Sequence, residues 1–139
     1  DEVLAPDQLD AALSRADVVV LALPLTRTTK HFLDAERVAL IKPGALVVNV
    51  GRGELIDEPA LIEALQQGRI AGAGLDVTYE EPLPKSSPLW TDPRVLLTPH
   101  VAATDPAHME RATELFEKNL ELYLAGQPLI NVVDKKAGY

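Results

Sequence analysis

Residues 46–52 read Leu-Val-Val-Asn-Val-Gly-Arg, and this stretch decides the fold of the chain. It opens with apolar, mostly β-branched residues, which is typical of a buried strand. The strand breaks at Gly51, and Arg52 is the first residue beyond the break. Open α/β sheets bind ligands at the carboxyl ends of their strands, and the planar guanidinium of arginine grips carboxylates well. Arg52 is therefore a candidate ligand-binding residue, and a surface arginine in a loop is the alternative.

The composition indicates one globular domain with an acidic surface. The 139 residues are 47% hydrophobic and 24% charged, and the formal net charge is -8. That charge argues against nucleic acid or an anionic membrane as a partner. No apolar run approaches the roughly 18 residues of a membrane span. The absence of cysteine excludes disulfides, and the acidic amino terminus does not resemble a signal peptide, so we expect a cytoplasmic location.

Apolar runs and helix signals alternate outward from residues 46–52. Strands are expected over residues 18–23, 45–50, 70–77 and 95–97, and the first two are expected to be buried on both faces. Helices are expected over residues 7–15, 34–40, 57–67 and 106–124, with Asp7, Asp34 and Asp57 as caps of the first three. Repeated alternation of strand and helix predicts an α/β fold with a parallel sheet.

Polar residues follow the ends of these strands. Arg52 follows the second strand, and Asp76 ends the third. Glu81 lies in the loop after the third strand, and His100 follows the fourth. Strand ends of one polarity share an edge of a parallel sheet, so these residues are expected to converge on one crevice. Histidine is a common general acid–base, a nearby carboxylate favours its protonated form, and arginine polarises an anionic carbonyl compound. Taken singly, His100 also fits a loop histidine and Glu81 a solvated loop charge.

Three ordered motifs resemble signatures of the D-isomer-specific 2-hydroxyacid dehydrogenase family. Residues 49–58, Asn-Val-Gly-Arg-Gly-Glu-Leu-Ile-Asp-Glu, resemble the arginine signature. Residues 75–83, Leu-Asp-Val-Thr-Tyr-Glu-Glu-Pro-Leu, resemble the acidic signature, and residues 97–103, Leu-Thr-Pro-His-Val-Ala-Ala, the histidine signature. Their order and spacing also agree. The resemblance covers nearly the whole chain, and the loop after Pro82 points toward the glyoxylate or hydroxypyruvate reductases of the family.

The resemblance implies that the catalytic residues are Arg52, Glu81 and His100. Arg52 would hold the carboxylate and carbonyl of a 2-oxo acid. His100 would protonate the carbonyl oxygen as a nicotinamide delivers hydride to the carbon, and Glu81 would pair with His100. Asp76 would contact the nicotinamide carboxamide. The implied cofactor is NAD or NADP, no metal is expected, and the implied cofactor-binding positions are Leu23, Pro24, Val50, Gly51, Arg52, Asp76, His100, Ala102 and Ala103.

The resemblance also implies a domain organisation. The expected fold is the carboxy-terminal half of a Rossmann-like doubly wound parallel sheet, followed by a long carboxy-terminal helix. The family's glycine-rich fingerprint precedes this region, and neither of the close glycine pairs here, at 51 and 53 or at 72 and 74, opens a helix as the fingerprint requires. Residues 1–125 are therefore expected to be a partial nucleotide-binding domain. Residues 126–139 are expected to be a tail that returns to a substrate domain.

The expected function is that of an NAD(P)-dependent D-2-hydroxyacid dehydrogenase. Such an oxidoreductase transfers hydride between a nicotinamide cofactor and a small 2-oxo or 2-hydroxy acid. The resemblance implies a homodimer as the intact protein, and the 139 residues alone are expected to be inactive. Two alternatives stay open: a nucleotide-sensing, corepressor-like protein that binds protein partners, and a catalytically silent NAD-binding protein of the same superfamily.

Overall fold

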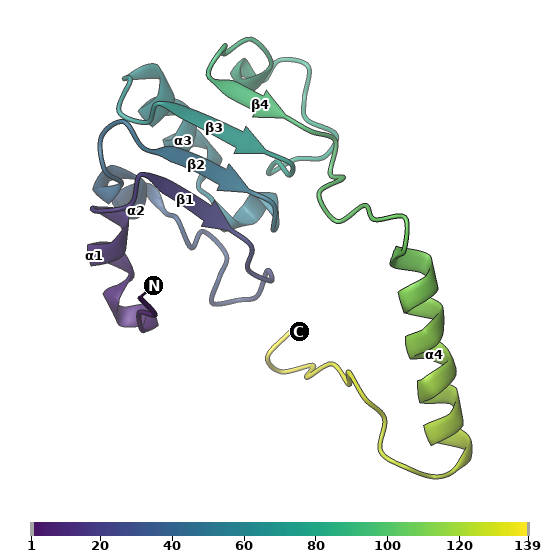
Figure 1. Ribbon diagram of the computed structural model, residues 1–139. Helices are drawn as coiled ribbons and strands as arrows, with labels where there is room; N and C mark the ends of the chain where they lie inside the picture. Colours follow the sequence, from purple (N-terminus) through teal and green to yellow (C-terminus); the bar gives the residue numbers. More distant parts are fainter. Residues whose placement is uncertain (1, 139) are drawn as a thin grey trace. The chain divides into compact units, whose positions relative to one another are not determined.

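The chain divides into two compact units, residues 1–102 and 103–139, in a computed structural model that describes residues 2–138. Figure 1 shows the first unit as a sheet with helices packed against it, and the second as one long helix followed by an irregular tail. The expected domain boundary after residue 125 stays a prediction.

The first unit is built on a four-stranded parallel sheet with the strand order β1-β2-β3-β4. Its strands are β1 (Val18–Leu21), β2 (Leu46–Asn49), β3 (Gly72–Leu75) and β4 (Val95–Leu97). Each lies within a range expected from the sequence, which confirms the α/β class. Because all four strands run in the same direction, their carboxyl ends lie along one edge of the sheet.

Short helices connect the strands of this unit. They are the 3-10 turn η1 (Pro6–Gln8), α1 (Leu9–Leu13), α2 (Ala35–Leu40), the 3-10 turn η2 (Gly53–Leu55), α3 (Glu58–Gln66) and the 3-10 turn η3 (Pro88–Trp90). Asp34 and Asp57 cap α2 and α3 as expected, accepting hydrogen bonds from the backbone of Arg37 at 2.9 Å and Ala60 at 3.1 Å. Asp7 is not a cap, because Pro6 starts a 3-10 turn that already contains it.

The core lies between the helices and one face of the sheet. Val47 and Leu75 of the sheet belong to the same buried cluster as Leu61 and Leu65 of α3. Full burial of such a side chain contributes about 1.5–3 kcal/mol, so this cluster is the main source of stability in the unit. It fixes the strand ends, and hence the loops that leave them.

The opposite face of the sheet is apolar and uncovered within the first unit. Val20, Val48, Gly74 and Leu96 are neighbours across the four strands, and Val20 and Leu96 are 59% and 69% exposed. The expectation that the first two strands are buried on both faces is therefore wrong for the described residues. All helices of the unit pack on the other face, so the apolar pattern of the strands is matched by a covering layer on one side only.

The second unit holds the longest helix, α4 (His108–Leu124). It begins two residues later than expected, and Gly126, with φ +63°, ends it as the sequence indicates. Its apolar side chains Met109, Phe116 and Tyr123 are exposed within this unit. Among the described residues, no helix has both the length and the apolar character needed to cross a membrane.

Candidate active site

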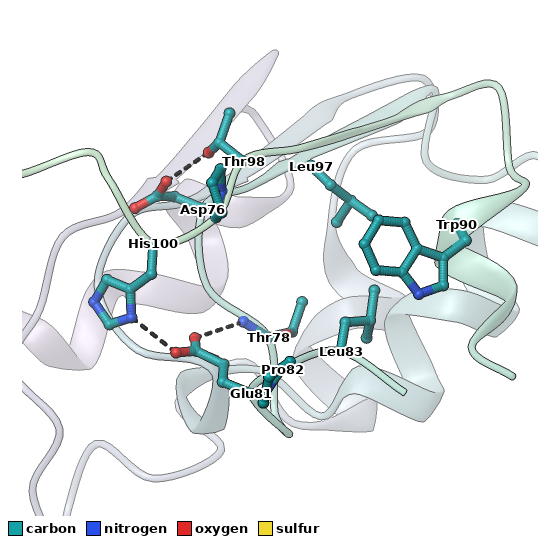
Figure 2. A pocket seen from close by; sticks show the side chains of 10 residues that line it. Asp76, Thr78, Glu81, Pro82, Leu83, Trp90, Leu97, Thr98 and His100 are labelled. Atoms are coloured by element: carbon teal, nitrogen blue, oxygen red, sulfur yellow. Dashed lines mark hydrogen bonds and ion pairs between the residues drawn. The ribbon is translucent and has the colours of Figure 1, made fainter. Parts of the chain in front are cut away.

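The predicted polar residues leave the same edge of the sheet on three neighbouring loops. Arg52 lies just beyond the end of β2, Asp76 directly follows β3, and His100 follows β4. Glu81 comes from the loop between β3 and β4. Figure 2 shows Asp76, Glu81 and His100 close together, with the histidine ring pointing toward the Glu81 carboxylate. The sheet topology therefore brings these residues together as the sequence predicts.

His100 and Glu81 form a hydrogen-bonded pair. The ring Nδ1 of His100 lies 2.8 Å from Oε2 of Glu81, and the backbone N–H of Thr78 donates to Oε1 of Glu81 at 3.1 Å. The hydrogen bond to His100 lowers the pKa of Glu81; burial opposes this, and the Thr78 N–H and the charges of His100 and Arg52 reinforce it. Because Nδ1 is paired with Glu81 and the His100 side chain is 44% exposed, Nε2 is the ring nitrogen that can meet a reactant.

Asp76 holds the backbone on both sides of His100. Its carboxylate accepts hydrogen bonds from Thr98 Oγ1 at 2.5 Å, Val101 N at 2.9 Å and Ala102 N at 2.8 Å. Its carbonyl oxygen accepts the N–H of His100 at 2.8 Å. His100 has φ +54°, a left-handed conformation that costs a residue with a Cβ about 1–3 kcal/mol. The contacts to Asp76 therefore stabilise an unfavourable backbone that presents the imidazole.

The environment of Asp76 keeps its carboxylate ionised. Burial acts to raise the pKa of this side chain, but the hydrogen bonds from Thr98, Ala102 and Val101 outweigh it, with help from the charge of His100, and the pKa is lowered. Only 6% of the residue is exposed. A buried carboxylate that accepts several hydrogen bonds holds the donor groups firmly in place, because each donor would lose its partner if the backbone moved away.

Arg52 is exposed at the start of the turn that follows β2, and a residue that the sequence analysis did not single out supports that turn. Asn49, 1% exposed, donates from Nδ2 to the carbonyl of Arg52 at 2.8 Å and accepts the N–H of Gly51 at 3.0 Å. The Arg52 guanidinium donates to the carbonyl of Gly51 at 2.7 Å. The signal for Asn49 was a polar residue inside an apolar strand, since a buried amide needs hydrogen-bond partners.

The predicted cofactor positions after β1 and β2 lie against one another. Val50 donates its N–H to the carbonyl of Leu21 at 3.0 Å. A Cβ added to Gly51 would lie 2.9 Å from the carbonyl oxygen of Leu23 and 2.7 Å from a methyl of Leu55, so only glycine fits there unless these groups shift. Pro24 directly follows Leu23 in this stretch of backbone. Ala102 is fastened to Asp76 as described, and Ala103 begins the second unit. Their roles in cofactor binding stay predictions.

A cavity of about 510 Å³ opens beside the His100–Glu81 pair. Leu83, Trp90 and Leu97 supply its apolar wall, and Figure 2 shows these side chains on the side away from the histidine. The indole Nε1 of Trp90 donates to the carbonyl of Pro84 at 3.0 Å, which holds the ring at the cavity wall. Leu83 and Trp90 carry no sequence signal, because apolar side chains in a proline-rich loop have no periodic pattern, and Leu97 was expected only as a residue of the fourth strand.

Comparison with known proteins places this geometry in a family. Residues 1–102 match the family model of the D-isomer specific 2-hydroxyacid dehydrogenase, NAD binding domain. Glyoxylate/hydroxypyruvate reductase B of Pectobacterium carotovorum is 42% identical over 91% of this chain and 39% of its own length. The crystal structure of a D-isomer specific 2-hydroxyacid dehydrogenase from Xanthobacter autotrophicus, in complex with NADPH and MES, is 43% identical, with a TM-score of 0.90 over 96% of this chain and 54% of its own.

A second solved structure carries a more specific activity in its name. The NADPH-dependent glyoxylate/hydroxypyruvate reductase of Sinorhizobium meliloti, in complex with NADP and sulfate, is 36% identical. Its TM-score is 0.87 over 96% of this chain and 43% of its own. The chain thus spans less than half the length of the curated relatives it matches.

Proposed function

Because the chain belongs to the D-isomer-specific 2-hydroxyacid dehydrogenase family, we propose that the full-length protein is an NAD(P)-dependent reductase of small 2-oxo acids. The observation that carries the proposal is the 2.8 Å pairing of His100 Nδ1 with Glu81 at the sheet edge where Arg52 also lies. The reductases among its relatives make glyoxylate and hydroxypyruvate the first compounds to test.

Arg52 binds the substrate in this proposal. A guanidinium has five N–H donors in a planar fork, and the carbonyl of Gly51 occupies one of them. The remaining donors match the carboxylate of a 2-oxo acid and draw electron density from its adjacent carbonyl. The hydrogen bonds of Asn49 fix the backbone of Gly51 and Arg52, from which the guanidinium projects. The substrate carboxylate is therefore held in a defined position.

His100 moves the proton. In reduction its Nε2 donates a proton to the carbonyl oxygen, and in oxidation the same nitrogen takes the proton from the hydroxyl. The bound nicotinamide nucleotide supplies or receives the hydride at the carbon. Glu81 stays ionised because its pKa is lowered. It therefore stabilises the positive charge on the ring and accepts a hydrogen bond from the protonated Nδ1, which leaves Nε2 to exchange the proton with the reactant. Asp76 holds the histidine backbone throughout.

The residues at this edge fit the nicotinamide end of a dinucleotide. The absent Cβ of Gly51 lets the backbone after β2 pack closely on the carbonyl of Leu23, so Leu23, Pro24, Val50 and Gly51 form one stretch of strand-end backbone against which a nicotinamide ring would bind in this proposal. Asp76 Oδ2 accepts one hydrogen bond and has an acceptor position left for an amide donor. The choice between NAD and NADP is left open in the proposal.

The proposal extends to the setting of the whole protein. We place it in the cytoplasm as a homodimer without a nucleic-acid partner, with residues 1–125 in the nucleotide-binding domain and residues 126–139 leading to a substrate domain. The absence of cysteine supports the cytoplasmic location, the net charge of -8 supports the absence of a nucleic-acid partner, and the homodimer rests on the family resemblance alone. The family match over residues 1–102 supports the domain assignment.

The test is the oxidation of NADH or NADPH by the purified full-length protein with glyoxylate or hydroxypyruvate. We expect turnover with at least one pair, and His100→Gln should lower kcat by about a hundredfold to ten-thousandfold, the usual contribution of general acid–base catalysis. His108→Gln, which alters an exposed histidine of α4, serves as the control and should keep the parent rate. Absence of turnover with any 2-oxo acid, or full activity in His100→Gln, would contradict the proposal.

A further inference from the structure

The loop that carries Glu81 is held at one peptide group by the segment that follows β2. We define the acidic loop as residues 78–81. Glu58, the first residue of α3, accepts the backbone N–H of Tyr79 on Oε2 at 2.9 Å. A Cβ added to Gly53 would overlap the carbonyl of Thr78, so the backbone at Gly53 packs directly on the acidic loop. Both contacts act on the peptide group between Thr78 and Tyr79.

Hydrogen bonds continue to the imidazole from Thr78, whose carbonyl belongs to this peptide group and whose N–H belongs to the preceding one. The N–H of Thr78 donates to Oε1 of Glu81 at 3.1 Å, and its hydroxyl donates to the carbonyl of Glu80 at 2.8 Å. The other oxygen of Glu81 pairs with His100 at 2.8 Å. The position of the Glu81 carboxylate, and with it the ring of His100, therefore depends on where the Thr78–Tyr79 peptide group is held.

We propose that Glu58 is a positioning residue that sets the Glu81–His100 pair by anchoring the Thr78–Tyr79 peptide group. Glu58 acts through the acidic loop and touches no reactant. A charged acceptor holds an N–H more firmly than a neutral one, which suits a loop whose placement must not drift. The inference rests on the proposed function, because it assigns Glu58 to the same acid–base pair.

A simpler role for Glu58 is to stabilise α3, since an acidic residue in the first turn of a helix interacts favourably with the helix dipole. Glu36 provides the matched comparison. It lies in the first turn of α2, its side chain is exposed, and it is far along the chain from the acidic loop. If Glu58 served only its helix, the two residues would respond alike to the same replacement.

The test compares variants of the full-length protein in NAD(P)H-dependent reduction of the 2-oxo acid that it turns over. Glu58→Ala should lower kcat by about ten- to hundredfold, the usual effect of losing a group that orients a reacting residue. Glu58→Gln should stay within about twofold of the parent, because its amide oxygen can accept the Tyr79 N–H. Glu36→Ala should keep the parent kcat. Glu58→Asp keeps the charge at the helix start but shortens the reach, so its kcat should fall as in Glu58→Ala. This variant keeps the inference testable if Glu58→Ala does not fold.

A double variant separates action through Glu81 from general damage. Adding Glu58→Ala to Glu81→Ala should cause no further loss of kcat, because the group that Glu58 positions is already absent. An additional loss of about tenfold or more would overturn the inference, as would parent-like kcat in both Glu58→Ala and Glu58→Asp. If His100→Gln and Glu81→Ala also keep the parent kcat, the proposed function fails as well; if they lose it while the Glu58 variants do not, only the positioning role fails.

Discussion

At the residue scale, Asp76 shows how one buried carboxylate can fix the backbone that presents the proposed acid–base residue, His100. In Asp76→Asn the amide nitrogen faces backbone N–H groups that need an acceptor, so at least one hydrogen bond is lost. We expect the free energy of unfolding at neutral pH to fall by about 2–3 kcal/mol, as for a buried donor left unsatisfied. Urea unfolding of parent and variant measures it, and Asp17→Asn, which alters an exposed carboxylate, is the control.

The same replacement has a defined pH dependence. The pKa of Asp76 is lowered in the folded protein, so its charge stabilises the fold above the unfolded pKa of about 3.9. That contribution is lost as the pH falls through the folded pKa. The difference in unfolding free energy between parent and Asp76→Asn should therefore be full at pH 7 and shrink below about pH 4. An equal difference at both ends of this range would show that the charge of Asp76 is not what stabilises the histidine loop.

Arg52→Lys tests substrate capture. An ammonium cannot reproduce the planar fork of a guanidinium, so we expect KM for the 2-oxo acid to rise by about tenfold or more, with a smaller change in kcat. Steady-state kinetics of the full-length protein measure both. Arg15→Lys alters an arginine whose side chain is 71% exposed and should leave both constants unchanged. An unchanged KM in Arg52→Lys would remove Arg52 from the substrate site.

The convergence of the residues proposed to carry chemistry was easier to predict than the contacts that support them. Arg52, Glu81 and His100 follow strand ends, and the rule that parallel strands share a carboxyl edge was enough to bring them together. Asn49 and Glu58 act on backbone groups of turns. Which N–H a side chain meets depends on the path of the loop, and the sequence pattern does not contain that path.

At the scale of elements, the start of α3 connects stability to the site. Asp57 caps this helix directly before Glu58, so Asp57→Ala should lower the free energy of unfolding by about 1 kcal/mol, the usual cost of a lost cap. Asp34→Ala removes the corresponding cap of α2 and should cost a similar amount. Urea unfolding of both variants checks this, and an unchanged stability in both would mean that the caps do not stabilise these helices.

The positions of the elements followed from the sequence, whereas the covering of the sheet did not. Apolar runs located all four strands, and the cap residues Asp34 and Asp57 located two helices. The runs in β1 and β2 also predicted burial on both faces, and Val20 shows that one face is open within this unit. An apolar pattern indicates that a face can be buried, but it carries no information on which segment covers it.

At the scale of the whole molecule, the open sheet face has a consequence for the isolated chain. Val20, Val48 and Leu96 form an apolar row across the sheet, and contiguous exposed patches of this kind promote association. The purified 139-residue chain should therefore self-associate as its concentration rises. Light scattering checks this, with Leu96→Lys as the variant that reduces association. A stable monomer at high concentration would show that the face is not a binding surface.

The isolated chain should also lack dehydrogenase turnover. Its sequence contains the candidate acid–base pair but no glycine-rich turn that opens a helix after a strand, which is the usual cradle for a dinucleotide pyrophosphate. Assays of the 139-residue chain with NADH or NADPH and glyoxylate or hydroxypyruvate measure this. Sustained oxidation of either nucleotide would mean that the chain binds and positions the cofactor by itself.

The pairing of Glu81 with His100 is tested most directly by the pH dependence of reduction in the full-length protein. In the proposed mechanism reduction requires the protonated imidazole, and the ionised Glu81 carboxylate, 2.8 Å from the ring, stabilises that form. Glu81→Gln removes the charge and keeps the size, so the electrostatic stabilisation of the pair is lost. We expect the basic limb of the kcat/KM profile to move to lower pH in Glu81→Gln and to stay in place in Glu80→Gln, which alters the exposed neighbouring residue. A basic limb that does not move in Glu81→Gln would contradict the assignment of Glu81 as the partner of the catalytic histidine.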